Sequence, residues 1–130
     1  MTKQFTLGKK ERLKSRKLTE QLFSEGKRFT LTPFRIYYLF SEKQAVPVQF
    51  GTGVSNKIFK KAVDRNRVKR LIREAYRVQK IQLQQQLENQ KLQLSIFFIY
   101  TTKELPEYKE VYHSTGKVLA KLCTIAAEIK

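Results

Sequence analysis

The feature that most limits how this chain can fold is the segment KKAVDRNRVKRLIREAYR, Lys60 to Arg77, in which eight of eighteen residues are Lys or Arg. Its apolar residues recur at helical spacing: on a helical wheel with Val68 at zero, Leu71, Ile72, Ala75, Tyr76 and Val78 fall within roughly 80° of it. The opposite arc collects Asn66, Lys69, Arg70, Arg73, Arg77 and Lys80, with Arg65 and Arg67 near the boundary. The segment therefore predicts a helix with one buried face and one nearly unbroken cationic face.

The positive charge of the chain is concentrated in two segments. The 130 residues include 27 Lys and Arg against 11 Asp and Glu, a formal net charge of +16. Residues 1–28 have nine basic and three acidic residues, and residues 57–80 have ten and two, so the two segments contribute +6 and +8. This clustering favours a docking surface for a nucleic acid or an anionic membrane. A solvated face with no partner is the alternative for a single basic helix.

The remaining segments alternate between helical and strand-like patterns. Residues 10–25 predict a helix, with Leu13, Leu18, Leu22 and Phe23 on one side and Gly26 as the C-cap. Strands are predicted in FTLTPFRIYYLF (29–40), VQFGTGV (48–54) and QLSIFFIY (93–100), and the two glycines of VQFGTGV leave room for a close approach to the backbone. The Gln-rich segment 81–90 either extends the basic helix or starts a loop. An amphipathic helix follows from Tyr108, with Pro106 and Glu107 in its first turn.

This order predicts a single α+β or α/β layered domain, residues 1–130, with helices covering a small sheet. Residues 1–10 are expected to form a flexible basic tail. The chain has one cysteine, Cys123, and its N-terminal residues lack the apolar run of a signal peptide. We therefore expect a cytoplasmic protein.

Residues for autonomous catalysis are sparse. The only Asp is Asp64, and the ten Glu are scattered through the sequence, although scattered carboxylates can still converge in a fold. His113 and Cys123 both lie on the C-terminal helix, where a structural or merely exposed role suits the first and a small buried apolar role the second. No cysteine–histidine metal spacing and no phosphate-binding glycine loop is present. We predict no catalytic residue and no metal site.

The aromatic residues suggest a second contact surface. Bulky groups occupy both faces of segment 34–40, so one face needs cover from a helix or from stacked bases. Tyr37, next to Arg35, is the best candidate for stacking on a base. A role in the core is the alternative.

The basic segment closely resembles the signature of the bacterial ribonuclease P protein component. The matching residues are Arg65, Asn66, Arg67, Lys69, Arg70 and Arg73. RLKSRKLTEQLFSEGKRF, FGTGVSNK and LSIFFIYTTKEL resemble other parts of the family in the right order, over roughly residues 10–125. Four residues depart from its pattern: Thr19 stands at the place of a usual Phe, Asn56 at that of a usual Lys and Phe59 near a usual glycine, and Tyr100 replaces a common Arg. The loop before the basic helix also has one extra residue.

The resemblance implies the order helix, three strands, helix, strand, helix, with a left-handed βαβ crossover. It implies a protein that binds a catalytic RNA and assists its endonucleolytic removal of the 5′ leader from precursor tRNA. The RNA would carry the catalysis with magnesium, so the protein alone would be inactive and would hold no cofactor tightly. Neither a membrane nor an obligate protein partner is expected.

The resemblance also assigns candidate site residues by position. Those expected to contact the catalytic RNA are Lys57, Lys60, Lys61, Arg65, Asn66, Arg67, Lys69, Arg70, Arg73 and Arg77. Those expected in a leader-binding cleft between the first helix and the sheet are Phe23, Arg35, Tyr37 and Phe97. Three alternatives stay open: a ribosomal or assembly protein, a protein-only nuclease, and a peripheral membrane protein.

Overall fold

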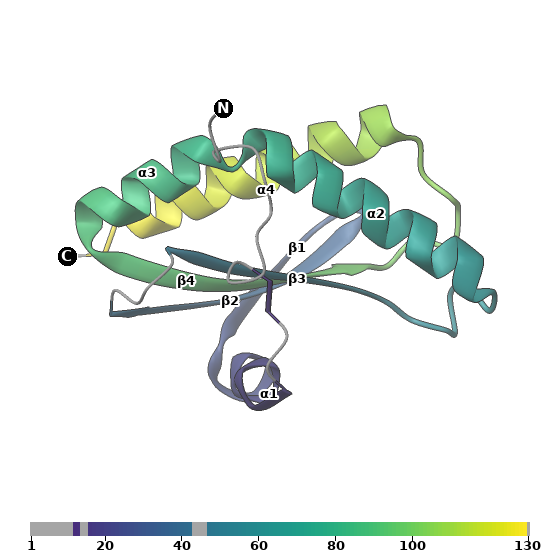
Figure 1. The fold of residues 1–130 in the computed structure, drawn as a ribbon, viewed down its shortest axis with the longest axis horizontal. Helices are drawn as coiled ribbons and strands as arrows, with labels where there is room; N and C mark the ends of the chain where they lie inside the picture. Colours follow the sequence, from purple (N-terminus) through teal and green to yellow (C-terminus); the bar gives the residue numbers. More distant parts are fainter. Residues whose placement is uncertain (1–11, 14–15, 43–46, 130) are drawn as a thin grey trace.

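A computed structural model describes residues 12–13, 16–42 and 47–129. Within these residues, helices pack on both faces of a four-stranded sheet (Figure 1). The elements in chain order are α1 (Arg16–Glu25), β1 (Lys27–Leu31), β2 (Phe34–Glu42), β3 (Val48–Val54), α2 (Ala62–Gln79), α3 (Ile81–Gln90), β4 (Leu92–Tyr100) and α4 (Tyr108–Ala127). The α+β class and the predicted order are thus confirmed, with one helix more than the resemblance implied.

The sheet has the strand order β1-β2-β4-β3, so β3 lies at one edge. β2 is antiparallel to β1 and β4, whereas β3 and β4 are parallel. Parallel strands require a crossover connection, and α2 and α3 provide it. The left hand of this crossover stays a prediction.

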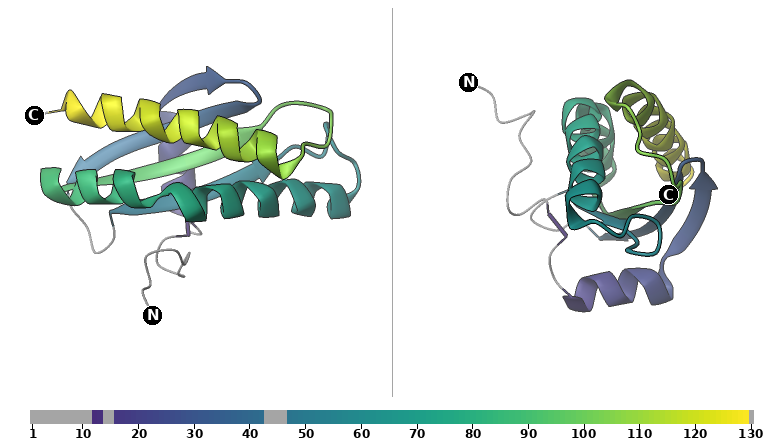
Figure 2. Two further views of the ribbon diagram at one scale, coloured as in Figure 1. Left: turned by 90° about the horizontal axis from the view of Figure 1, so that it is seen from above. Right: turned by 90° about the vertical axis from the view of Figure 1, so that its right-hand side faces the viewer.

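The core lies between the sheet and the layer formed by α2, α3 and α4 (Figure 2, right). Alternate residues of the strands face this layer because side chains of a strand point to opposite faces in turn. The buried residues of the sheet include Phe34, Ile36, Val48, Phe50, Leu94, Ile96 and Phe98, and those of the helices include Val68, Ile72, Ala75, Leu83, Leu87, Val111, Val118 and Leu122. The opposite face of the sheet carries α1 (Figure 1).

The ring of Tyr76 anchors α2 to the edge strand β3. It is fully buried and stacks on Phe50, with ring centroids 4.1 Å apart and planes 6° apart. Stacked aromatic pairs contribute about 0.5–1.5 kcal/mol beyond the apolar area that they bury. This contact determines which face of α2 is buried against the sheet and which is exposed to solvent.

The Gln-rich segment forms the separate helix α3, which lies beside α4 (Figure 2, left). Two of its glutamines bridge the helices: Gln86 Nε2 donates to the Cys123 carbonyl at 2.8 Å, and Gln90 Nε2 donates to the Ala126 carbonyl at 2.7 Å. The glutamines therefore stabilise the contact between two helices, and neither predicted alternative, an extended α2 or a loop, was right.

The prediction that Lys80 lies on the exposed cationic side of the helix was wrong. Lys80 was assigned to the cationic arc, but its residue is only 1% exposed. α2 ends at Gln79, and Lys80 is both the C-cap of α2 and the N-cap of α3. The wheel assumed one continuous helix, and the break between α2 and α3 turns this side chain inward.

The first helix and the first strands also differ from the prediction. Within the described residues α1 begins at Arg16, and Leu13 is buried outside the helix, where its N–H donates to the Phe50 carbonyl at 2.8 Å. Segment 29–40 is split by a turn at Thr32–Pro33, whose peptide bond is cis, into β1 and β2. The predicted tail, residues 1–10, lies outside the described residues.

α4 begins at Tyr108, as predicted, and only the place of Pro106 differs. Glu107 is the N-cap, and a capping box joins it to Glu110. Pro106 is buried just before the cap instead of standing in the first turn. The capping box satisfies backbone N–H groups at the helix start.

Candidate nucleic-acid interface

The cationic side of α2 is exposed because the other side of the helix is packed in the core. Val68, Ile72 and Ala75 have no exposed surface. The residues on the open side are Asn66, Arg67, Arg70 and Arg73, which are exposed, and Lys69, which is half-buried. We call these five residues the α2 cationic face. The wheel predicted all of them except Arg67, which it placed near the boundary.

Arg65 differs from its neighbours because its side chain folds back onto the preceding loop. Its Nη1 donates to the carbonyl oxygens of Phe59, at 2.8 Å, and Lys60, at 2.9 Å. These bonds tie the start of α2 to the loop before it. The guanidinium of Arg65 thus has a role in shaping the protein, and its predicted contact with RNA stays a prediction.

The loop before α2 is anchored by Phe59 and Tyr100, two of the residues that depart from the family pattern. Phe59 is 7% exposed, and its ring stacks on Tyr100, with centroids 6.1 Å apart and planes 18° apart. With Phe59 held inward, the predicted contacts Lys57, Lys60 and Lys61 are left exposed. The loop thus adds three cations beside the start of the α2 cationic face.

Arg77 forms an ion pair with Glu74, which lies three residues earlier on α2. The hydrogen bond from Arg77 holds the pKa of Glu74 below its usual value, and the same bond raises the pKa of Arg77. Arg77 therefore already has an anionic partner within the protein, and its contact with RNA stays a prediction.

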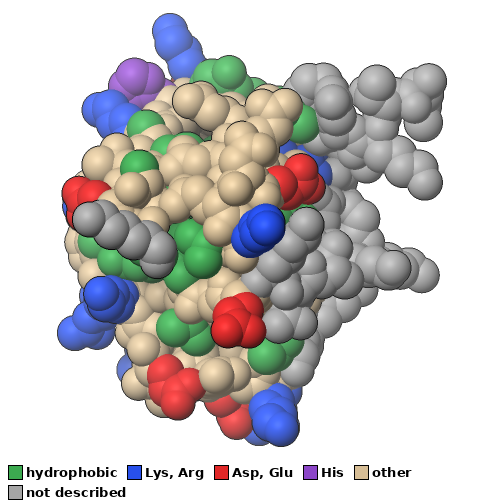
Figure 3. Space-filling model, turned by 90° about the vertical axis from the view of Figure 1, so that its left-hand side faces the viewer, with side chains coloured by type: hydrophobic (Ala, Val, Ile, Leu, Met, Phe, Trp, Pro, Cys, Tyr) green, Lys and Arg blue, Asp and Glu red, His purple; other side chains and the backbone are tan. Residues whose placement is uncertain are grey.

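The charge is mixed on the end of the molecule that Figure 3 shows. At the end of the molecule near the C-terminus and the α3–β4 turn, the basic and acidic side chains of the described residues are interspersed (Figure 3). Polyanion binding requires neighbouring cations. The α2 cationic face and the loop before it provide them.

Three predicted cleft residues meet on the sheet face that carries α1. The ring of Phe23, which projects from α1, lies edge-on to Tyr37 of β2 and to Phe97 of β4, with centroid distances of 4.8 and 5.1 Å. Phe23 is 42% exposed, and the other two are half-buried. The three rings form what we call the aromatic cluster, which packs against itself and is still open to solvent at one side.

The two glycines of β3 make room for the aromatic cluster. Gly51 lies opposite Phe97 in the strand register. A Cβ atom at Gly51 would lie 2.7 Å from the Phe97 ring, and one at Gly53 would lie 2.8 Å from it. The group that closely approaches the glycine backbone, as the sequence predicted, is therefore the Phe97 ring of the protein itself.

Arg35 extends the same face one row along the sheet. Arg35 pairs with Ile99 of β4, and Ile99 pairs with Gly53 of β3. On this face of the sheet, these three residues form the row that neighbours the row of Tyr37, Phe97 and Gly51. The side chain of Arg35 is exposed. All four predicted cleft residues therefore share one face of the sheet, with a cation beside the aromatic cluster.

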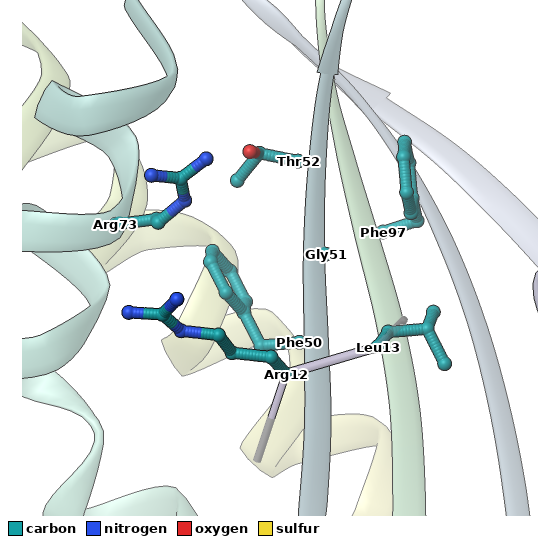
Figure 4. A pocket seen from close by; sticks show the side chains of 7 residues that line it. All are labelled: Arg12, Leu13, Phe50, Gly51, Thr52, Arg73 and Phe97. Carbon is teal, nitrogen blue, oxygen red and sulfur yellow. The ribbon is translucent and has the colours of Figure 1, made fainter. Parts of the chain in front are cut away.

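A cavity of about 200 Å³ lies at the outer edge of β3, between the aromatic cluster and α2 (Figure 4). We call it the edge pocket; its lining residues are Arg12, Leu13, Phe50, Gly51, Thr52, Arg73 and Phe97. Arg12 and Thr52 were not predicted as site residues. The only signal for Arg12 was its place in the N-terminal cluster of positive charge.

Two other kinds of site were searched for in the described residues. No three His, Cys, Asp or Glu side chains among residues 12–13, 16–42 and 47–129 gather as metal ligands would. None of the helices in that part of the chain is long and apolar enough to cross a membrane. His113 is exposed, Cys123 is half-buried, and burial raises the pKa of the Cys123 thiol.

Comparison with known proteins gives a consistent set of relatives. The family model described as Ribonuclease P matches residues 7–123. The chain is 40% identical over 119 residues to the ribonuclease P protein component of Porphyromonas gingivalis (strain ATCC 33277), covering 91% of this chain and 87% of the relative. It is 33% identical over 127 residues to the ribonuclease P protein component of Chlorobium phaeobacteroides, covering 88% and 86%.

The fold has a counterpart among solved structures. The RNase P protein of Staphylococcus aureus superposes with a TM-score of 0.65, over 86% of this chain and 94% of that one. The sequence identity is 23%. This likeness concerns the fold, which the two proteins share.

Proposed function

This chain belongs to the ribonuclease P protein family, and from that membership we propose that it binds the catalytic RNA of ribonuclease P and the 5′ leader of precursor tRNA. In this role it assists the endonucleolytic removal of the leader, which forms the mature 5′ end of the tRNA. The RNA carries the chemistry with magnesium, and the protein alone is inactive.

The observation that carries this proposal is the α2 cationic face. Arg67, Arg70 and Arg73 project from one anchored helix, and each guanidinium can hold a phosphate through two parallel hydrogen bonds. Cations placed between RNA segments reduce the repulsion of their backbones, a task that magnesium otherwise performs. We therefore assign Asn66, Arg67, Lys69, Arg70 and Arg73, with Lys57, Lys60 and Lys61 of the loop, to the catalytic RNA.

The aromatic cluster supports the second half of the proposal. Phe23 offers a partly open ring beside Tyr37 and Phe97, and Arg35 lies one row away on the same face. A single strand of RNA needs stacking surfaces for bases and a cation for its backbone. We assign these four residues to the leader. Because mature tRNA lacks the leader, these contacts would make the protein favour binding of precursor tRNA over binding of the mature product.

The test is cleavage of precursor tRNA by the cognate catalytic RNA at low magnesium, with and without the protein. We expect cleavage to be stimulated by the protein and absent with the protein alone. Arg67→Ala should weaken RNA binding and leave the melting temperature nearly unchanged, since its side chain lies in solvent. Lys117→Ala on α4, also exposed, is the matched control. No stimulation by the wild-type protein would refute the proposal.

A further inference from the structure

The edge pocket is formed where residues 12–13 pair with the outer edge of β3. Residue 12 makes a parallel bridge with Phe50, and the N–H of Leu13 donates to the Phe50 carbonyl at 2.8 Å. Successive side chains of this segment therefore point to opposite sides of the sheet. Arg12 projects to the side of α2, and Leu13 lies on the other side with Phe97 (Figure 4).

Two guanidinium groups from distant parts of the sequence converge on this pocket. Arg12 comes from the N-terminal segment and Arg73 from α2, and both project on the same side of β3 as Thr52 (Figure 4). None of the seven lining residues is acidic. Partial burial of the Arg73 guanidinium, followed by the nearby charges of Arg12 and Arg70, lowers the pKa of Arg73. Like charges held together in this way are stabilised by an anion between them.

The size of the pocket suits a small tetrahedral anion with its water. Its volume is about 200 Å³, well above the ~10–15 Å³ that a single water molecule needs by this measure. Two arginines and one hydroxyl are the donor set that phosphate oxygens accept from. A base would find less support, because the Phe50 ring is already stacked on Tyr76.

We propose that the edge pocket binds one backbone phosphate of RNA, held between Arg12 and Arg73 with the hydroxyl of Thr52 as a third donor. This inference rests on the proposed function and adds a site to it. Phe97 lines the pocket and also belongs to the aromatic cluster, and Arg73 belongs to the α2 cationic face. The site therefore joins the two surfaces, and one RNA strand can pass over the edge of β3 from one to the other.

The test is the salt dependence of RNA binding for Arg12→Ala, Arg73→Ala, the double variant and the control Lys117→Ala. Each phosphate contact contributes about 0.7–0.9 to the slope of log affinity against log salt. Because both arginines hold the same phosphate, each single variant should lower the slope by about 0.7–0.9, and the double variant by no more than that. Each single variant should also weaken binding about tenfold or more, whereas Lys117→Ala should leave the slope unchanged.

Two arms distinguish the source of the phosphate. Binding is measured to the catalytic RNA alone, and to precursor and mature tRNA in the presence of the catalytic RNA. A changed slope with the catalytic RNA alone assigns the phosphate to that RNA. A changed slope only with precursor tRNA assigns it to the leader. Either result supports the site.

Other results overturn the inference. If the wild-type protein binds but the Arg12 and Arg73 variants keep its slope in both arms, the edge pocket holds no phosphate and the proposed function still stands. If the double variant loses twice the slope of either single variant, the arginines contact separate phosphates. If the wild-type protein binds no RNA, the proposed function fails and the inference fails with it.

Protein stability serves as the control for folding. Removing one of two like charges should leave the melting temperature of each variant at or above that of the wild type. If an alanine variant melts earlier, Arg12→Lys and Arg73→Lys replace it. These variants keep the charge and lose the planar fork, so they should keep the slope and lose affinity if the arginines grip a phosphate. Unchanged affinity in both lysine variants would contradict the clamp.

Discussion

Arg65 and Arg67 are two residues apart in one basic motif, yet their side chains do different work. Arg65 donates to two carbonyl groups of the loop before α2, whereas Arg67 is exposed. A motif of alternating arginines therefore combines a residue that shapes the protein with a residue that can meet RNA. The sequence alone makes the two arginines look alike.

Replacement of Arg65 by alanine should cost stability. The change removes two hydrogen bonds from a charged donor, which together contribute about 1.5–3 kcal/mol. Urea unfolding should show this loss, with Arg67→Ala within about 0.5 kcal/mol of the wild type as the matched control. Equal stability of the two variants would mean that the Arg65 bonds contribute nothing to the fold.

The ion pair of Glu74 and Arg77 should make stability depend on pH. The hydrogen bond from Arg77 lowers the pKa of Glu74 in the folded state. The pair therefore stabilises the fold above the unfolded-state pKa of a glutamate, about 4.3, and loses this effect as the pH falls through the lower folded-state pKa. The stability difference between the wild type and Glu74→Gln should shrink between about pH 6 and about pH 3.

The size of that difference should be small, because both side chains are partly exposed. High salt should reduce it further at neutral pH, since salt screens exposed charges. Chemical denaturation at several pH values measures both effects. A difference that grows as the pH falls would contradict the assigned direction of the Glu74 pKa.

Among the elements, β3 needs glycine at two positions because a side chain of the neighbouring strand β4 packs against its backbone. Gly51 leaves space for the Phe97 ring, which a Cβ atom would approach to 2.7 Å. Gly51→Ala should therefore cost about 1–3 kcal/mol, as overpacking of a filled site does. In a Phe97→Ala background the same change should cost much less. A double-mutant cycle measures this coupling, and equal costs in both backgrounds would refute it.

α2 is the element that the sequence predicted best. Its period identified Val68, Ile72 and Ala75 as buried and Arg70 and Arg73 as exposed, because both sets follow from the geometry of one helix. Prediction failed where the helix stops. Lys80 is buried where α2 ends and α3 begins. A helical wheel treats the segment as one continuous helix and cannot show where that helix ends.

In the strands and the sites, too, local residue patterns did not predict features that depend on turns or on distant contacts. The Thr32–Pro33 turn divides a segment that reads as one strand, and the resemblance to a family, not the residue pattern, indicated the extra strand. Phe23 and Phe97 of the aromatic cluster were assigned by the same resemblance, whereas Tyr37 was also indicated by its place beside Arg35. Arg12 was missed because its role depends on a bridge to Phe50, a residue far along the chain. Contacts between distant segments are not encoded in any local period.

For the whole molecule, the sheet separates two surfaces with different chemistry. The α2 cationic face lies on one side and the aromatic cluster on the other, and the edge of β3 is where they approach each other (Figures 1 and 4). Of the net charge of +16, residues 57–80 supply +8, so half of it lies on α2, the loop before it and Lys80. This arrangement suits a protein that positions RNA segments relative to one another.

The most direct test of this account is the identity of the RNA that the protein binds in its own cells. The protein is purified under native conditions, and the bound RNA is sequenced and assayed. One non-coding RNA should dominate, and that RNA alone should cleave precursor tRNA at high magnesium. Replacing Arg67 and Arg70 by alanine should reduce its recovery. Recovery of ribosomal RNA in its place, unaffected by these substitutions, would contradict the account.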